Sequence, residues 1–430
     1  MRALQVGLAG LGTVGGGVVR LLAAHADVIA ERAGRAIRVA AVAARDRAKQ
    51  RDLPLNDVRW VDDARALATD TSIDVVVEVI GGADGVAREL TEAALKAKKP
   101  VVTANKAMLA LHGTALARAA EAAGVPIACE AAVAGGIPIV KALREGLAAN
   151  RIERVFGILN GTCNYILTQM QESGRGFAEV LAEAQKLGYA EADPSFDVDG
   201  IDAAHKLAVL AGIAFNRPVD FGAVHIEGIR AVDAIDIDYA RELGYRIKLL
   251  AIARRTRDGI EQRVHPCMVD AEQAIAHVDG VFNAVVAEGD FVDRTMYVGR
   301  GAGAGPTASA VVADLIDVAR GKVPPLYGVA AAHLADIPAA PMERHVGEYY
   351  VRLTVADRPG VIADVSAVLR DERISIESLL QRARAVSDEA VPVVMVTHET
   401  EEAAMRRALA KIGALASVTA PPCMIRIEQL

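Results

Sequence analysis

Carboxylates crowd the segment 184–206, AQKLGYAEADPSFDVDGIDAAHK, just before Lys206. Gly200 and the apolar run that follows Lys206 predict a turn that enters a helix. Asp202 and Lys206 then lie four residues apart on one helical face, where a carboxylate can hold an ammonium in place. A lysine held in this way is suited to proton transfer. A solvated acidic loop followed by an ordinary helical salt bridge is the other interpretation.

A glycine-rich turn lies near the N-terminus, between the predicted strand 4–9 and a predicted single helix over 18–34. In the pattern G-x-G-x-x-G, the first glycine permits a tight turn and the second lets the backbone approach a pyrophosphate. The third lets the helix pack on the strand, and the helix N-terminus attracts phosphate. An unrelated α/β turn is the alternative. The predicted dinucleotide-binding residues are Gly10, Gly12, Thr13, Val14 and Gly15.

Strands alternate with helices through the next hundred residues. The segments 74–82 and 100–106 read as strands, and 85–99 reads as the helix between them. This alternation predicts a parallel sheet that binds ligands beyond the carboxyl ends of its strands.

Arg45 ends the second predicted strand, where a site for NAD usually carries an acid, although an arginine at a strand end could simply be solvated. An arginine suits the 2′-phosphate of NADP instead, so we expect NADP(H) as the cofactor. NAD(H) remains possible because Asp46, one residue later, could bind a ribose hydroxyl.

Three further groups of residues could take part in catalysis or binding. Lys106, in Thr103-Ala104-Asn105-Lys106, is expected to end a buried strand and face the cleft, although it could be a surface lysine that opens the next helix. Glu130 precedes a glycine-rich loop, and such a carboxylate could hold a hard monovalent cation. The segment 160–162, Asn-Gly-Thr, begins a predicted helix and could bind an amino-acid carboxylate, or Thr162 could simply cap that helix.

Composition and charge limit the class of protein. The 430 residues predict two or three domains, and 52% hydrophobic with 24% charged residues is globular composition. The net charge of -7 argues against a nucleic-acid partner. No apolar run reaches the roughly 20 residues of a membrane span, and no signal peptide is expected. Four widely spaced cysteines suggest reduced thiols in a cytoplasmic protein.

The acidic segment resembles the signature of homoserine dehydrogenases. The matching positions, without a gap, are Ala184, Gly188, Tyr189, Asp193, Pro194, Asp197, Gly200, Asp202 and Lys206. The resemblance covers nearly the whole chain. It implies reversible hydride transfer between L-homoserine and L-aspartate 4-semialdehyde, within threonine and methionine biosynthesis.

The resemblance also implies roles for individual residues. Lys206 would be the catalytic acid/base, and Lys106 an auxiliary catalytic residue on the cofactor side. Thr103 and Gly303 would contact the cofactor, Gly303 from a loop that closes over the nicotinamide. The segment 301–307 is predicted to be a flexible loop that leads into a helix over 308–321. A structural sodium ion would be held by Glu130 with the main chain at Val133, Gly135 and Ile137. The substrate-binding residues would be Gly161, Thr162, Tyr189, Glu191, Asp197 and Asp202.

The C-terminal region resembles an ACT domain. An alternating strand, the turn Asp-Arg-Pro-Gly at 357–360, a helix and a strand ending in Gln381 begin a βαββαβ pattern, which 390–430 complete. This resemblance implies threonine as an effector, although the domain could serve assembly alone. Consecutive strands over 245–300 predict an antiparallel sheet that can pair subunits, so we expect a homo-oligomer, a dimer or tetramer.

The predicted fold class is α/β with three domains. A Rossmann-type dinucleotide-binding domain would cover 1–130, and an α+β substrate and dimerisation domain with a mainly antiparallel sheet would cover 131–323. The last helix of the second domain would return to the first. A linker over 324–347 would lead to a ferredoxin-like ACT domain over 348–430.

Two rival functions are compatible with parts of the chain. A semialdehyde dehydrogenase would use Cys163 as a covalent nucleophile, which needs an activated thiolate with a base beside it. No histidine lies near Cys163 in the sequence. A non-catalytic amino-acid sensor would keep the ACT domain and a degenerate dinucleotide fold. The intact glycine motif and both lysines argue against that sensor.

Overall fold

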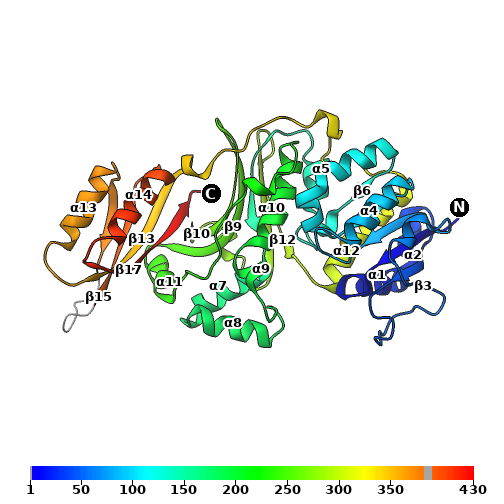
Figure 1. The fold of residues 1–430 in the computed structure, drawn as a ribbon, viewed down its shortest axis with the longest axis horizontal. Coiled ribbons are helices and arrows are strands. Elements are labelled where there is room, and N and C mark those ends of the chain that lie inside the picture. Colours follow the sequence, from blue (N-terminus) through cyan, green and yellow to red (C-terminus); the bar gives the residue numbers. More distant parts are fainter. Residues whose placement is uncertain (1, 382–389) are drawn as a thin grey trace.

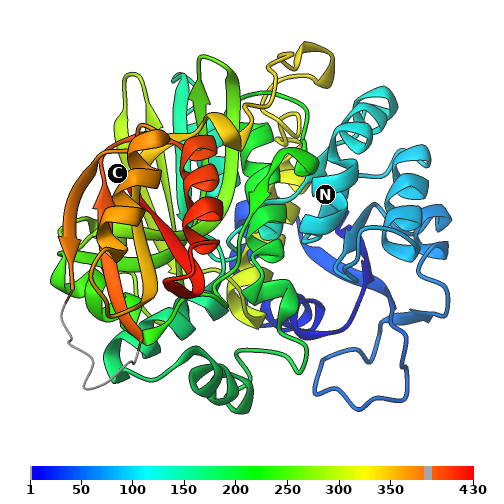
Figure 2. The same cartoon turned by 60° about the vertical axis from the view of Figure 1, so that its left-hand side comes forward.

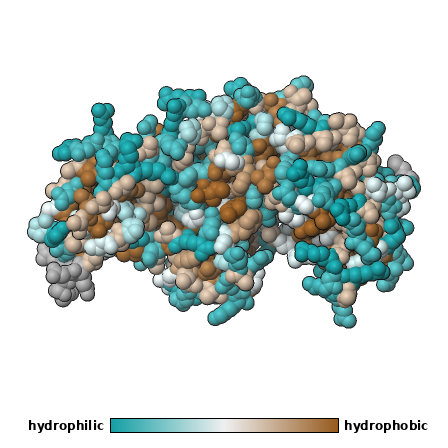
Figure 3. Space-filling view, in the orientation of Figure 1, coloured by the Kyte–Doolittle hydropathy of each residue, from teal (hydrophilic) through white to brown (hydrophobic). Residues whose placement is uncertain are grey.

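The computed structural model describes residues 2–381 and 390–430. Figure 1 shows an elongated molecule with the N-terminal unit at one end, a central unit, and the C-terminal unit at the other end. Figure 2, turned about the vertical axis, brings the C-terminal unit forward. On the face drawn in Figure 3, apolar residues gather near the middle, and the outer parts are mostly hydrophilic.

The N-terminal unit contains a six-stranded parallel sheet in the order β3-β2-β1-β4-β5-β6. This sheet confirms the predicted Rossmann-type fold. Its strands are β1 (Leu4–Ala9), β2 (Ile37–Ala43), β3 (Arg59–Val61), β4 (Val75–Glu78), β5 (Val101–Thr103) and β6 (Ile127–Ala128). Its helices are α1 (Thr13–Ala24), α2 (Ala26–Ala33), α3 (Ala66–Thr69), α4 (Val86–Lys96) and α5 (Lys106–Ala123).

The single helix expected after the glycine turn is instead two helices. α1 and α2 are bent by 86° at His25, so that part of the prediction was wrong. The bend lets Ile29 and Ala33 join the same buried cluster as α1, β1 and α12 instead of continuing into solvent. Among the described residues no single helix is long and apolar enough to cross a bilayer, and the α1–α2 pair meets that test only in length and composition.

The central unit packs helices against a large sheet. Its strands are β7 (Ile152–Ile158), β8 (His225–Ile226), β9 (Tyr245–Thr256), β10 (Gly259–Asp270), β11 (Phe282–Gly289) and β12 (Asp293–Arg300). β12, β11, β7, β9 and β10 form the expected antiparallel run. The short β8 pairs parallel with β10, so the sheet as a whole is mixed.

The helices of this unit connect the sheet to the N-terminal unit. They are α6 (Ile139–Lys141), α7 (Gly161–Ser173), α8 (Phe177–Lys186), α9 (Ser195–Val198), α10 (Ile201–Ala214), α11 (Ala234–Glu242) and α12 (Ala304–Arg320). Single turns add η1 (Glu130–Ala132), the π-helix η2 (Ala142–Gly146), η3 (Phe221–Ala223) and η4 (Ala274–His277). α12 packs on α1, which is the expected return to the first domain.

α10 holds the central position in this arrangement. All its residues from Asp202 to Ala214 are buried, because it packs on β7, β9 and β10 at one side and on α5 at the other. A helix buried all round needs apolar residues on every face, which explains the continuous apolar run in the sequence. α10 therefore carries its few polar residues to the boundary between the two units.

The C-terminal unit has the expected βαββαβ order. Its elements are β13 (Val346–Ala356), α13 (Val361–Asp371), β14 (Ile376–Leu380), β15 (Ala390–Thr397), α14 (Glu402–Gly413) and β17 (Val418–Glu428), with the short β16 (Thr400–Glu401). The strand order β17-β13-β15-β14 is that of a ferredoxin-like ACT domain. β14 ends at Leu380, one residue before the expected Gln381.

The sheets of the central and C-terminal units are one continuous sheet. β17 pairs parallel with β10, through Cys267 with Arg426, Met268 with Ile427 and Val269 with Glu428. We call this junction the seam. The ACT unit is therefore joined to the central unit by backbone hydrogen bonds as well as by the connecting segment.

The segment 324–347 is more structured than a simple linker. It contains η5 (Ala331–His333) and η6 (Met342–Arg344), and its last two residues already belong to β13. The Ala331 amide donates to the Glu121 carboxylate of α5, and the Ala335 amide donates to the Asn216 carbonyl. These bonds tie the segment along the N-terminal and central units on its way to the ACT unit.

Candidate active site

Two lysines from different units converge on one buried carboxylate. Lys206 Nζ lies 2.6 Å from Asp202 Oδ2, and Lys106 Nζ lies 3.1 Å from Asp202 Oδ1. The side chains of Asp202 and Lys206 are 6% and 9% exposed, whereas that of Lys106 is 34% exposed. Asp202 thus holds the more accessible Lys106 ammonium near the surface, and the Lys206 ammonium lies deeper at the boundary of the two units.

Local backbone geometry explains the position of Lys206. Gly200 has φ +85°, a left-handed conformation that favours glycine, and it lets the chain turn directly into α10. Asp202 and Lys206 then face each other across one helical turn, as the sequence predicted. Lys206 Nζ also donates to the carbonyl of Leu159 at 2.7 Å, just beyond the end of β7. The ammonium is therefore fixed by both a helix and a strand end.

Asn160 is a component that the sequence interpretation did not assign. Its amide nitrogen donates to Asp202 Oδ2 at 2.9 Å and to Asp197 Oδ1 at 2.8 Å, and its amide oxygen accepts from the Cys163 amide at the start of α7. One side chain therefore caps α7 and connects two carboxylates of the acidic segment. The Asn-Gly-Thr motif could have indicated it, because asparagine is a preferred N-cap residue.

The surroundings shift the pKa values of Asp202 and Asp197 in opposite directions. Burial alone would raise the pKa of Asp202, but the nearby Lys206 and Lys106 ammonium groups outweigh burial and hold that pKa below its usual range. Burial raises the pKa of Asp197, while the hydrogen bond from Asn160 opposes that rise. Asp202 is therefore a fixed anion that orients both lysines.

The other predicted substrate residues form a second group beside the cluster. The Thr162 hydroxyl donates to the Tyr189 carbonyl at 2.8 Å, and the exposed Tyr189 ring packs at 4.8 Å from the ring of Tyr165. Gly161 lies against the Val281 carbonyl, which a Cβ atom would approach to 2.8 Å. Glu191 is exposed. Among the contacts of the described residues, none joins the Glu191 carboxylate to either lysine.

Cys163 has none of the properties of a nucleophile. It is fully buried, its thiol donates to the Asp197 carbonyl at 3.2 Å, and burial raises its pKa well above the ordinary value. The neighbouring carboxylates raise that pKa further. Since nucleophilic attack needs a thiolate, the rival mechanism through Cys163 has no support in this geometry.

The glycine turn has the geometry of a phosphate-binding loop. Gly10 has φ +104°, and a Cβ there would lie 2.6 Å from the Val79 carbonyl. A Cβ at Gly15 would lie 1.9 Å from the Gly10 carbonyl, whereas at Gly12 it would meet nothing within 4 Å. Gly12 therefore leaves room for a ligand, and Thr13 begins α1 with its amide directed by the helix. Val14 is half-buried in the same first turn.

A cavity of about 930 Å³ extends from this turn along the end of β2. Its lining includes Gly12, Arg45, Asp46, Lys49 and Arg51. A cavity of this size suits a dinucleotide-sized ligand. The cationic side chains lie beyond β2, where the ribose of such a ligand is expected.

The position of Lys106 on the cofactor side differs from the sequence interpretation. β5 ends at Thr103, and Lys106 is the first residue of α5, so the expectation that Lys106 ends a strand was wrong. Asn105 terminates the strand because its side chain caps α5 through the Met108 amide. Thr103 is fully buried, and its hydroxyl donates to Glu78 at 2.7 Å.

Gly303 lies at the N-cap of α12 with φ +122°. The segment after it was expected to be a flexible loop, but α12 already begins at Ala304. The tight contact of Gly17 with the Ala304 carbonyl explains this early start, because α12 packs directly on α1. Among the described contacts, none joins Gly303 to the lysine cluster.

Glu130 lies in a buried, oxygen-rich turn. Its carboxylate accepts hydrogen bonds from the Val140 amide at 3.0 Å and the Lys141 amide at 2.8 Å. Burial, together with the nearby Asp314 carboxylate, raises the pKa of Glu130 to about 7. The predicted main-chain ligands Val133, Gly135 and Ile137 are buried in the same turn. A hard cation fits this donor set, since it would compensate a desolvated carboxylate.

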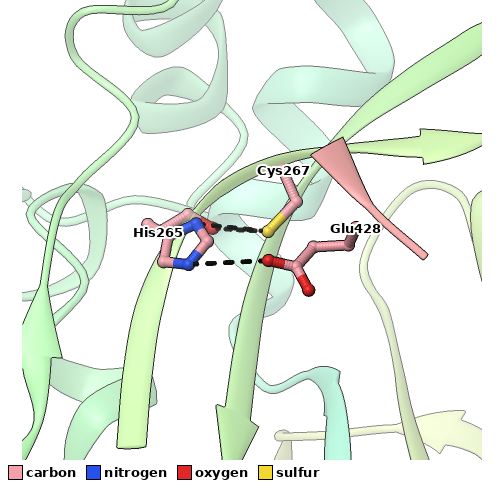
Figure 4. A group of neighbouring side chains, drawn as sticks. All are labelled: His265, Cys267 and Glu428. Carbon is pink, nitrogen blue, oxygen red and sulfur yellow. Dashed lines mark hydrogen bonds and ion pairs between the residues drawn. The ribbon is translucent and has the colours of Figure 1, made fainter. Parts of the chain in front are cut away.

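A second group of potential metal ligands lies at the seam. Figure 4 shows His265 and Cys267 from β10 facing Glu428 from β17, all buried. Arg263 donates to His265 Nε2 at 2.8 Å, and burial, with the Arg426 and Arg263 charges, lowers the pKa of His265 well below its usual value. A cation here would meet a guanidinium already in contact with the imidazole. The group therefore serves to join the two units.

The family comparisons agree with this geometry. Family models described as homoserine dehydrogenase, NAD binding domain, as homoserine dehydrogenase, and as ACT domain match residues 10–130, 138–316 and 349–414. A homoserine dehydrogenase from Pseudomonas aeruginosa is 49% identical, and the match covers 100% of both chains. One from Neisseria gonorrhoeae is 46% identical over 100% of both chains.

Solved structures give the same result. A homoserine dehydrogenase from Thiobacillus denitrificans has a TM-score of 0.94 at 49% identity, covering 99% of this chain and 98% of the other. A hyperthermophilic archaeal homoserine dehydrogenase in complex with NADPH has a TM-score of 0.64 at 27% identity, covering 76% and 100%. With these relatives, and with a dinucleotide-type glycine turn beside a paired-lysine cluster, the chain belongs to the homoserine dehydrogenase family of oxidoreductases.

Proposed function

We propose that this chain interconverts L-homoserine and L-aspartate 4-semialdehyde by hydride transfer with NADP(H). The convergence of Lys206 and Lys106 on Asp202, at the boundary of the Rossmann unit, is the observation that supports it. Reducing an aldehyde requires a donor of hydride, close positioning of both partners and a proton for the oxygen. The nicotinamide supplies the hydride when the cofactor is bound.

The chain's own residues perform the remaining steps. Lys206 gives a proton to the oxygen of the semialdehyde as it becomes the hydroxyl of homoserine, and takes it back in the reverse direction. Lys106 holds the same oxygen from the cofactor side, and Asp202 keeps both ammonium groups oriented. Gly161, Thr162, Tyr189, Glu191 and Asp197 bind the amino-acid end, and Glu191 pairs with the substrate ammonium.

Initial rates of homoserine oxidation with NADP and with NAD test this function directly. We expect oxidation with a preference for NADP. No oxidation with either cofactor, in a protein that is folded by circular dichroism, would remove the proposed activity.

Arg45 is proposed to contact the 2′-phosphate of NADP, with Lys49 and Arg51 beside it in the same cavity. Arg45→Ser should raise the KM for NADP about tenfold, or by roughly 1.4 kcal/mol, and leave the KM for NAD nearly unchanged. Arg47→Ser is the matched control, because the Arg47 guanidinium packs over Trp60 at 5.6 Å and does not line the cavity. Equal losses with both cofactors would contradict the assignment.

Threonine is proposed as an inhibitor that acts through the ACT unit. A cavity of about 390 Å³ opens at the seam, between Asp199 and Arg230 on the central side and Met424 on β17. Its size and its mixed charges suit an amino acid. Arg230 pairs at 2.5 Å with Asp199, which belongs to the acidic segment, so an occupant would disturb the site.

A threonine titration of the homoserine oxidation rate should show saturable inhibition. Arg230→Gln should weaken that inhibition, and Arg241→Gln, an exposed arginine of α11 paired with Asp238, should not. Full activity at all threonine concentrations would leave the ACT unit with an assembly role. A homodimer or tetramer is proposed because the large sheet can pair subunits. Light scattering measures the oligomeric state.

A structural sodium ion is proposed at Glu130 and the main chain of Val133, Gly135 and Ile137. Protons compete with the cation, because the pKa of Glu130 is raised to about 7. Sodium chloride should therefore raise the melting temperature more at pH 8 than at pH 6, relative to choline chloride at equal ionic strength. Glu130→Gln should abolish the difference. An identical response to both salts would exclude the site.

A further inference from the structure

An aromatic side chain of α9 lies beside the more accessible catalytic lysine. The Lys106 ammonium lies 5.9 Å from the centre of the Phe196 ring, while Asp202 holds the same ammonium at 3.1 Å. Phe196 is 42% exposed, which is unusual for a large apolar residue within an otherwise polar segment. Phe196 is not one of the matched signature residues of the acidic segment.

The Phe196 ring is the outer member of a stack of three rings. His205 of α10 lies 5.5 Å from Phe196 between ring centres, and Phe221 of η3 lies 4.4 Å from His205. The stack therefore runs from the exposed side of the cluster, through the buried His205, to the half-buried Phe221, which packs against the core. Aromatic rings at these distances attract one another beyond their simple burial.

His205 acts in this stack as a neutral ring. It is buried, and its Nδ1 has no hydrogen-bond partner among the described residues. Burial lowers its pKa, the Asp202 charge opposes that change, and the Lys106 charge adds to it. An unpartnered buried nitrogen has a cost that calls for an explanation. The explanation is that the flat His205 ring supports the Phe196 ring.

α9 itself is held from its other side. Arg230 pairs with Asp199 at 2.5 Å and donates to the Ser195 hydroxyl at 3.2 Å. The Ser195 amide donates to Asp193 at 3.1 Å. Because both ends of this single turn are anchored, Phe196 presents its ring from a fixed backbone.

We infer that Phe196 is a positioning residue for Lys106. The ring attracts the ammonium, and together with Asp202 it fixes the direction in which Lys106 meets the reacting oxygen; His205 and Phe221 hold the ring in place. Such an attraction is stronger once water is excluded, as it is when substrate and cofactor cover the cluster. A leucine fills similar space but lacks the negative ring face. The inference rests on the proposed function only where it is tested by the rate of homoserine oxidation.

The variants Phe196→Leu and Phe196→Tyr distinguish the effect of the aromatic ring from the effect of side-chain volume. Phe196→Leu should lower kcat for homoserine oxidation about three- to thirtyfold, with a change in homoserine KM below about twofold. Phe196→Tyr keeps the ring face and should retain kcat within about twofold. Phe291→Leu, at a ring that is 90% exposed, is the matched control.

A readout independent of turnover keeps this inference separate from the proposed function. Lysines labelled with ¹³C by reductive methylation can be followed by NMR, with Lys106→Arg used to assign the Lys106 signal. The Phe196 ring should change the chemical shift of the Lys106 signal. This change should be lost in Phe196→Leu and kept in Phe196→Tyr. A Lys106 signal that does not change in Phe196→Leu, a kcat that does not change in Phe196→Leu, or equal losses of kcat in Phe196→Leu and Phe196→Tyr would overturn the inference.

Discussion

Lys206→Ala is expected to lower kcat for homoserine oxidation by about 10²- to 10⁴-fold, the contribution of a positioned acid or base. The substitution removes the group proposed to exchange the proton and leaves the Rossmann unit intact. Lys206 contacts Asp202 and the Leu159 carbonyl, and both are distant from the glycine turn in the sequence. NADPH affinity, measured by the fluorescence of the bound cofactor, should therefore change by less than about twofold.

Lys248→Ala is the matched control for this experiment. Lys248 is also a buried lysine paired with a carboxylate, Asp279, and it bonds to a carbonyl, that of Val278. Its loss should lower the melting temperature without a comparable loss of kcat in the folded enzyme. If Lys206→Ala instead lost NADPH binding, or kept its turnover, the assignment of Lys206 as the acid/base would be wrong.

Arg426→Met is expected to destabilise the junction of the ACT and central units by about 3–5 kcal/mol, the usual cost of removing one partner of a buried ion pair, because the remaining partner of Glu402, Arg406, is half exposed. The Arg426 side chain is 1% exposed. It lies 2.7 Å from Glu227 of the central unit and 2.9 Å from Glu402 at the start of α14. Urea unfolding followed by circular dichroism measures the change in the free energy of unfolding.

The pH dependence of this effect has a definite sign. Burial would raise the pKa of Glu402, but Arg426 outweighs burial and lowers it below the ordinary 4.5. The stabilisation is therefore present above pH 4.5 and is lost as the pH falls through the lowered value. In Arg426→Met the Glu402 carboxyl loses the charge that most opposes burial, so its pKa rises and the difference in stability between the two proteins should narrow as the pH falls.

Arg407→Gln is the control for the seam. Arg407 is an exposed arginine of the same helix, α14, and pairs with Glu372. Exposed pairs contribute little, so its loss should change stability by less than about 1 kcal/mol. If Arg426→Met had as small an effect as this control at pH 7.5, the charge network would not hold the units together.

Patterns within one element were read correctly from the sequence. The glycine turn, the entry into α10 through Gly200 and the four-residue spacing of Asp202 and Lys206 are all local. So is the alternation that gave the βαββαβ order of the ACT unit. Local patterns suffice for these features because a turn or a helical face involves only a few consecutive residues.

Features that depend on several elements were missed or misplaced. The bend at His25 follows from packing on α12, whose residues lie far along the chain. Asn160 was interpreted only as part of a carboxylate-binding segment, but its amide connects Asp197 and Asp202. The early start of α12 at Ala304 likewise depends on its contact with Gly17. In each case the deciding partner is remote in sequence.

The sequence by itself determined the family resemblance, the kinds of domain, and the face of α10 that carries Asp202 and Lys206. Only the tertiary structure decided that Lys106 meets the same carboxylate, that Phe196 lies over Lys106, and that β17 extends the central sheet along β10. The physical reason is that a helix or turn is fixed by neighbours in the chain. Convergence of charges from separate units is fixed by how their apolar surfaces pack.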